Sequence, residues 1–130
     1  MTNDNYPTDE WLLSLFSGWD DPCPLNPNFE TDGLTRIWAD RTFVNPPYSD
    51  PLPWIEKAVS EARGGKIVVL LLKMDTSTKW FARLKEANAE FLWINGRLHY
   101  NGLHHTYKGN VPFPFPSMFA ILNPKGDDLT

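Results

Sequence analysis

The sequence predicts an α/β fold with a mostly parallel sheet and an antiparallel hairpin at one edge. Helix-like and strand-like segments alternate along most of the chain, as in parallel βαβ units. The apolar run KIVVLLL at 66–72 is typical of a central strand covered on both faces. Asn95-Gly96 separates two strand-like runs within 90–101, and this dipeptide favours a tight hairpin.

The first elements follow from cap and turn residues. Residues 7–18 predict a short helix, which Thr8 can cap and Gly18 can end. The proline-containing stretch 19–34 is expected to be an ordered loop, with a short strand ending near Asp20. The run RTFVN at 41–45 is the next strand candidate.

Two further helices and a last strand follow. The second helix is expected within 49–65, capped by Ser49 or Asp50, with Pro51 in its first turn and Gly64-Gly65 as its end. The third is expected within 76–89, capped by Thr76 or Ser77. The run SMFAILN at 117–123 predicts the last strand.

Composition limits the class of protein. The 130 residues fit a single compact domain, 1–130, with its core at about 6–122 and a frayed tail at 123–130. A net charge of −4 argues against a generally basic nucleic-acid coat, and a single cysteine, Cys23, excludes an internal disulfide. The polar first residues are unlike a signal peptide, and the longest apolar run is too short to cross a bilayer. We therefore expect a cytoplasmic protein with no membrane contact.

Three polar clusters fall at predicted strand ends: WDDPCP at 19–24, NPPYS at 45–49 and KMDTSTKW at 73–80. In the second cluster, Asn45 offers a side-chain carbonyl acceptor, and the Pro46 carbonyl, held by the ring of Pro47, offers another. Two adjacent acceptors suit a planar NH2 group with two hydrogens to donate, and Tyr48 offers a face on which a planar base can stack. A turn-forming role for Asn45 is the alternative.

Asn-Pro-Pro-Tyr resembles the (D/N/S)PP(Y/F) motif of amino-methyltransferases. Together with TDEWLLSLF, DDPCPLN, DGLTRIWADRTFVNPPYSDPLPWIEKA, KIVVLLLKMDTSTKWF, FLWINGRLHYNG and PFPSMFAIL, it resembles the phage-type, Dam-like DNA adenine-N6 methyltransferase family from about Tyr6 to Leu122. The resemblance implies a minimal Rossmann-like methyltransferase fold, S-adenosylmethionine as methyl donor, and adenine N6 in DNA as acceptor. No metal is required by this chemistry.

The resemblance also implies donor-binding positions. Asp20 and Asp21 would face the ammonium group of the donor, Thr8 precedes the helix that closes over its methionine part, and Asp32 would accept from its adenine amino group. Asp20 and Asp21 could instead be solvated loop acids, and Asp32 a turn or cap residue.

This sequence departs from larger relatives in lacking a glycine-rich FxGxG loop. Pro22, Cys23 and Pro24 stand where such glycines would be, and Pro22 and Cys23 are candidate donor contacts, although Cys23 could simply be a small packed side chain. The segment that usually holds the second and third strands is also short, which implies a minimal sheet.

Six residues are candidates for contact with double-stranded DNA or its flipped base: Ser49, Trp80, His104, His105, Tyr107 and Lys108. Trp80 could equally belong to the core. The two histidines have no further ligands at zinc-binding spacing. The chain has no room for a separate target-recognition domain, and it is expected to act as a monomer or homodimer.

Other functions remain open. Cytosine N4 and a protein glutamine present a similar NH2 group to the same turn. A catalytically decayed module that still grips DNA or a partner is a further alternative, which the missing glycine loop and the acidic charge favour. Uptake of S-adenosylmethionine distinguishes an enzyme from such a module.

Overall fold

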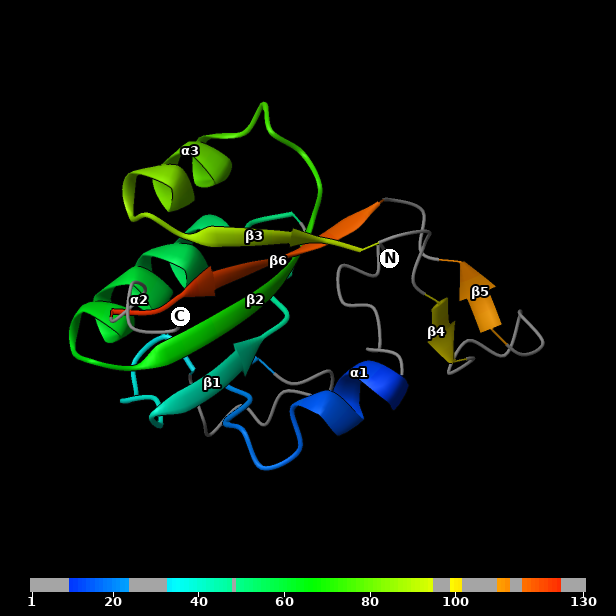
Figure 1. The fold of residues 1–130 in the computed structure, drawn as a ribbon, viewed down its shortest axis with the longest axis horizontal. Coiled ribbons are helices and arrows are strands. Elements are labelled where there is room, and N and C mark those ends of the chain that lie inside the picture. Colours follow the sequence, from blue (N-terminus) through cyan, green and yellow to red (C-terminus); the bar gives the residue numbers. More distant parts are fainter. Residues whose placement is uncertain are drawn as a thin grey trace.

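The computed structural model describes residues 10–23, 33–47, 49–94, 99–101, 110–112 and 116–124. Three helices and six strands are assigned within these ranges (Figure 1). They are α1 (Glu10–Leu15), β1 (Arg41–Val44), α2 (Leu52–Arg63), β2 (Ile67–Lys73), α3 (Lys79–Glu86), β3 (Glu90–Trp93), β4 (His99–Asn101), β5 (Asn110–Pro112) and β6 (Ser117–Leu122). No described helix has the length and apolar character needed to cross a membrane.

The main sheet has four strands in the order β1-β2-β6-β3. β1 pairs with β2 in parallel, whereas β6 pairs antiparallel with both β2 and β3. The prediction of an α/β fold is thus confirmed, but the prediction of a mostly parallel sheet is wrong. The last strand inserts between β2 and β3, so most of the pairings are antiparallel, while β1, β2 and β3 still run in the same direction.

The predicted hairpin around Asn95-Gly96 is also wrong. Of the two runs that flank this dipeptide, β3 pairs with β6, and β4 pairs with β5 in a separate two-stranded sheet. β6 supplies a long apolar strand that pairs with β2 on one edge and with β3 on the other, and Phe91 of β3 stacks on Phe81 of α3 with ring centroids 4.9 Å apart. These long-range contacts decide the pairing, and a local turn signal does not report them.

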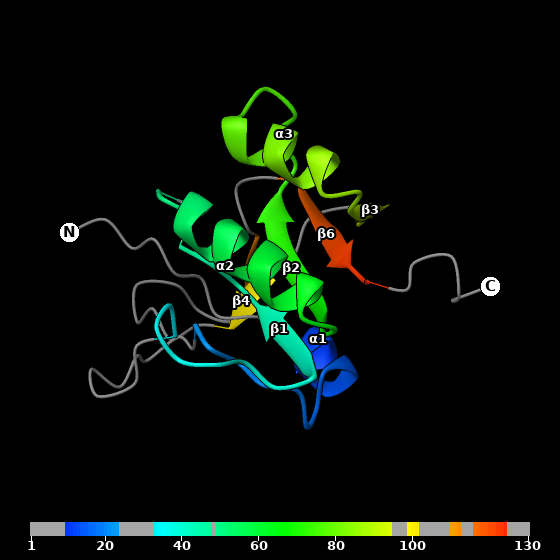
Figure 2. The same ribbon diagram turned by 90° about the vertical axis from the view of Figure 1, so that its left-hand side faces the viewer.

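The core surrounds β2, which confirms the prediction of a central strand covered on both faces. Val68, Leu70 and Leu72 pack with side chains of α2 and α3, whereas Val69 and Leu71 pack on the opposite face. That opposite face carries Leu12 of α1, and Figure 2 shows α1 on the other side of the sheet from α2 and α3. Each buried aliphatic side chain stabilises the fold by about 1.5–3 kcal/mol relative to full exposure.

α2 begins without a side-chain cap. Pro51 occupies the N-cap position and no side chain there makes a capping hydrogen bond, so the prediction that Ser49 or Asp50 caps this helix is wrong. The proline compensates in part, because it has no N–H to leave unsatisfied. The helix ends at Gly64-Gly65 as predicted, and Gly65 has a φ of 107°, a conformation that favours glycine.

α3 is capped one or two residues later than predicted. Thr78, rather than Thr76 or Ser77, accepts a hydrogen bond from the backbone N–H of Phe81 at 3.2 Å. Ser77 is already engaged with the carboxylate of Asp75, to which its backbone N–H donates at 3.1 Å. Because Ser77 takes part in this local turn at Asp75, it does not cap α3.

A buried carboxylate joins the end of α2 to the segments that precede β1 and β2. Glu61 accepts from Lys57 at 2.8 Å, from Lys66, and from the backbone N–H of Trp38 at 3.3 Å. Burial alone would raise its pKa, but the hydrogen bonds from the two lysines and the charge of Lys57 hold the pKa below the usual value. Both oxygens of the carboxylate thus accept hydrogen bonds, which compensates for the burial of its charge.

Candidate functional site

The carboxyl ends of β1, β2 and β3 lie at the same edge of the sheet, because these strands share one direction. β6 is reversed and begins there, with Ser117 paired to Lys73 and the Pro116 carbonyl accepting from the Met74 N–H at 2.7 Å. Asn45 follows β1 directly at this edge. Figure 1 shows the small β4–β5 sheet beyond the same edge. This edge is where open α/β sheets bind their ligands.

The segment around Asp20 lies beside β1. Its N–H donates to the Arg41 carbonyl at 3.0 Å, and its carbonyl accepts from the Phe43 N–H at 2.8 Å. These bonds form an isolated parallel bridge to Thr42, so the predicted short strand near Asp20 exists as a single bridge. Residues 21–23 therefore leave toward the edge at which Asn45 lies.

The carboxylate of Asp20 is engaged inside the protein. Both of its oxygens accept from the Arg36 guanidinium at 2.7 Å, and one also accepts from the backbone N–H of Ala39 at 3.0 Å. The hydrogen bonds from Arg36 lower the pKa of Asp20 despite partial burial. This geometry gives Asp20 a structural task, because it holds the chain before β1 in place.

Asp21 has a different environment. Its side chain reaches solvent, yet surrounding protein raises its pKa, and the neighbouring charge of Asp20 raises it further. A carboxylate whose charged form is disfavoured in this way gains the most from a bound cation. Of the two predicted acids, Asp21 is therefore the one suited to a cationic ligand.

Pro22 and Cys23 form part of a tightly packed turn. A Cβ placed on Gly33 would lie 2.0 Å from the Pro22 carbonyl oxygen, so only glycine allows this close approach. Cys23 packs against the core, and burial together with the charge of Asp21 raises its pKa to about 12. The thiol is neutral at physiological pH. Sequence analysis missed Gly33, although its place in the DGL triplet after the proline-rich loop could have indicated a close backbone approach.

The Asn-Pro-Pro turn is held firmly at the sheet edge. Pro46 is fully buried, and the side-chain oxygen Oδ1 of Asn45 is buried as well. Asn45 takes part in interactions of its own, so the residue is anchored to the fold. The two prolines restrict the backbone that carries the Asn45 side chain and the Pro46 carbonyl.

Two predicted substrate contacts lie within the described residues. Ser49 is exposed just after the turn, near the start of α2, where it can meet a ligand. Trp80 is only 7% exposed and packs in the core with side chains of α2 and α3. Its surroundings favour the alternative interpretation, in which Trp80 is a core residue.

The other predicted site residues lie outside the described residues, and their roles stay predictions. They are Thr8, Asp32, Tyr48, His104, His105, Tyr107 and Lys108. Among the residues that the structure does describe, no group of three or more His, Cys, Asp or Glu side chains is arranged to hold a metal ion.

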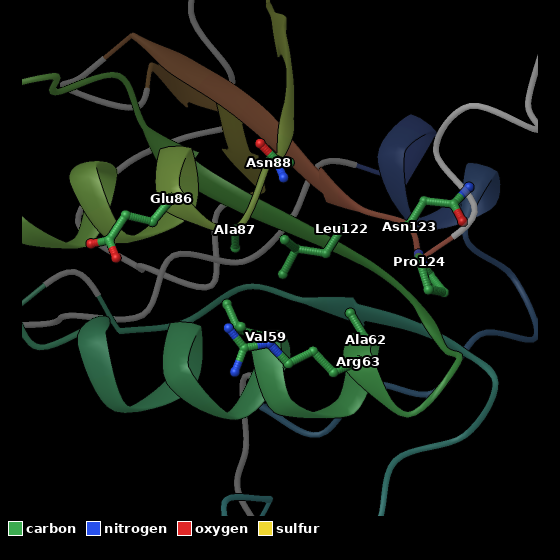
Figure 3. A pocket seen from close by; sticks show the side chains of 9 residues that line it. All are labelled: Val59, Ala62, Arg63, Glu86, Ala87, Asn88, Leu122, Asn123 and Pro124. Carbon is green, nitrogen blue, oxygen red and sulfur yellow. The ribbon is translucent and has the colours of Figure 1, made fainter.

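A cavity of about 360 Å³ lies at the opposite edge of the sheet (Figure 3). It is formed by the last turn of α2, the end of α3 and the end of β6. Its lining consists of Val59, Ala62, Arg63, Glu86, Ala87, Asn88, Leu122, Asn123 and Pro124. None of the predicted site residues contributes to it. The candidate site is therefore the edge of the sheet at which the Asn45-Pro46 turn and Asp21 lie.

Comparison with known proteins identifies a family that matches most of the chain. The family described as DNA N-6-adenine-methyltransferase (Dam) matches residues 20–123, a range that contains both Asp21 and Asn45. The DNA N-6-adenine-methyltransferase of Haemophilus phage HP1 is 35% identical over 99 residues, which are 74% of this chain and 57% of that protein. The protein of the same name from Escherichia phage T1 is 37% identical over 71 residues, 53% of this chain and 30% of that protein. The similarity thus spans less than two thirds of either relative, and no solved structure matches the chain.

Proposed function

We propose that this chain, which belongs to the DNA N-6-adenine-methyltransferase (Dam) family, transfers a methyl group from S-adenosylmethionine to the N6 amino group of adenine in DNA. The observation that carries the proposal is the position of Asn45-Pro46 at the carboxyl end of β1, next to the segment that carries Asp21. The codirectional β1, β2 and β3, with helices on both faces, also support a minimal Rossmann-like arrangement.

Asp21 would hold the donor. S-adenosylmethionine supplies a methyl group on a sulfonium centre, together with a cationic ammonium group. Asp21 is exposed, and burial of its carboxyl group raises its pKa, with a smaller contribution from the negative charge of Asp20, which would also attract a cation. Cys23 beside it is neutral, so it would present an uncharged surface and would not compete as a nucleophile. The acidic and uncharged groups at this place fit a cationic ligand.

Asn45 and Pro46 would hold the acceptor. The lone pair of the adenine amino nitrogen is delocalised into the ring, which makes it a poor nucleophile. The Asn45 side-chain oxygen and the Pro46 carbonyl would each accept a hydrogen bond from one N–H of the amino group. These hydrogens would then lie toward the turn, and the nitrogen lone pair would point at the methyl group. Positioning of this kind supplies much of the barrier reduction when the leaving group is already good. The proton leaves the nitrogen after transfer, through water.

The remaining predicted residues would act on the DNA. Tyr48 would stack on the flipped adenine, and Ser49 is exposed beside it. Lys108 and Tyr107, with His104 and His105, would contact the phosphate backbone or neighbouring bases. We propose a monomer or a homodimer acting on double-stranded DNA.

Transfer of tritiated methyl groups to unmethylated DNA, followed by nucleoside analysis, tests this function. The expected product is N6-methyladenine. Label in N4-methylcytosine would assign a different base as the acceptor, and donor uptake with no label in the DNA would leave protein glutamine as the acceptor to test. Calorimetric titration with S-adenosylmethionine completes the test, because a decayed binding module would take up no donor and transfer no label.

A further inference from the structure

We propose that the hydroxyl of Ser117 is a further substrate-binding group, which hydrogen-bonds the target nucleotide when DNA is bound. The inference rests on the proposed function. Ser117 is completely buried, and its Oγ atom has no hydrogen-bond partner in the structure. The other buried positions of β6 are the apolar Met118, Ala120 and Leu122, so a hydroxyl stands out in this strand.

Packing alone does not explain a serine at this position. A buried hydroxyl without a partner destabilises the fold, and alanine has nearly the same shape without that cost. Thr42 shows the ordinary arrangement in the same sheet, because its buried hydroxyl donates to the Ala39 carbonyl at 2.9 Å. The missing partner of Ser117 is therefore expected in another state of the protein.

The register of the sheet places Ser117 at the candidate site. It pairs directly with Lys73, the last residue of β2, so the two side chains share one face at the carboxyl edge. Asn45 follows β1, the neighbour of β2, at the same edge. Ser117 thus lies two strands from β1, a lateral separation of about 10 Å.

The same register indicates which ligand the hydroxyl meets. Asp21 lies beyond β1 on one side, because the Asp20 bridge pairs with Thr42. Ser117 lies on the other side, beyond β2. A base held by Asn45 separates these two sides, so Ser117 is on the nucleotide side and away from the donor. Adenine ring nitrogens accept hydrogen bonds, and a serine hydroxyl can donate one.

Ser117→Ala tests the proposal through stability, kinetics and direct binding. Its Tm should rise by about 4–11 °C, because an unsatisfied polar group is removed. The KM for unmethylated plasmid DNA, at saturating donor, should rise by about 3- to 10-fold, the effect of one neutral hydrogen bond. The donor Kd from calorimetry should stay unchanged. Ser117→Thr keeps the hydroxyl and should keep the KM within about twofold of wild type.

Thr42→Val is the matched control, since it removes a buried hydroxyl that has a partner. It should lower the Tm and leave the KM for DNA unchanged. The proposal fails if Ser117→Ala keeps the wild-type KM, whether its Tm rises or falls. Filter binding of unmethylated plasmid fragments separates this failure from a failure of the proposed function. If the wild-type protein transfers no methyl group, the proposed function is overturned. If Ser117→Ala then still binds DNA more weakly than the wild type does, the binding role of Ser117 is retained.

Discussion

Exchange of each of the two adjacent acids, Asp20 and Asp21, for asparagine should give opposite phenotypes. Asp20→Asn removes the charge that pairs with Arg36 through two bonds of 2.7 Å and that accepts from Ala39 at 3.0 Å. Because the pair is partly exposed, we expect a loss of about 1–2 kcal/mol in the free energy of unfolding, or about 3–8 °C in Tm. Donor affinity should change little.

Asp21→Asn should weaken donor binding and leave the stability of the protein unchanged. Its charged form is disfavoured in the fold, so its removal should not lower stability at pH 7. If Asp21 pairs with the donor ammonium, the lost charged hydrogen bond is worth about 1.5–3 kcal/mol, which raises the donor Kd by about 10- to 100-fold. Isothermal titration with S-adenosylmethionine and urea unfolding measure the two quantities on the same preparations.

The pH dependence supplies a further check. The pKa of Asp20 is lower in the fold than its ordinary value of 3.8, so its contribution to stability is complete above that pH. The contribution is lost as the pH falls through the folded pKa. The stability difference between wild type and Asp20→Asn should therefore begin to shrink as the pH falls below about 3.8, and should close only below the lower pKa of the folded state. A large loss of donor affinity in Asp20→Asn at unchanged stability would refute the assignment, as would wild-type affinity in Asp21→Asn.

Three further outcomes are expected. Glu61→Gln leaves Lys57 and Lys66 without their shared buried carboxylate, and should lower the free energy of unfolding in urea by about 2–4 kcal/mol. Cys23, with its pKa raised to about 12, should react with iodoacetamide at pH 8 far more slowly in the native protein than in urea; equal rates would contradict its burial. Lys108→Ala should weaken DNA binding and reduce the slope of log K against log salt by about one; an unchanged slope would assign this lysine to ordinary solvent exposure.

The central elements of the fold could be predicted from the sequence because their signals are local. The run at 66–72 is apolar at every side-chain position except its first, so it had to be covered on both faces, and the structure places it as β2. The glycine pair after α2 and the last strand could be recognised for similar reasons. The strand pairings could not be predicted, because β6 pairs with β2 and β3, which are distant from it in the sequence.

At the candidate site, too, only the features with a local sequence signal could be predicted. The Asn-Pro-Pro turn indicated its chemistry through residue types alone, and β1 places it at the expected edge. The sequence could not separate Asp20 from Asp21, because the difference depends on Arg36, which is 16 residues from Asp20 along the chain. It could not single out Ser117 either, since an unpartnered hydroxyl is visible only once the surrounding atoms are placed.

The most direct test of the account is the single-turnover rate of methyl transfer by Asn45→Ala. The change removes one of the two carbonyl acceptors proposed for the reacting amine, and it should slow transfer by about 10²–10³-fold with donor affinity near wild type. Asn123→Ala makes the same chemical change at the end of β6, at the opposite edge of the sheet, and should keep the wild-type rate. Wild-type transfer by a folded Asn45→Ala would contradict the assignment of this turn as the catalytic centre.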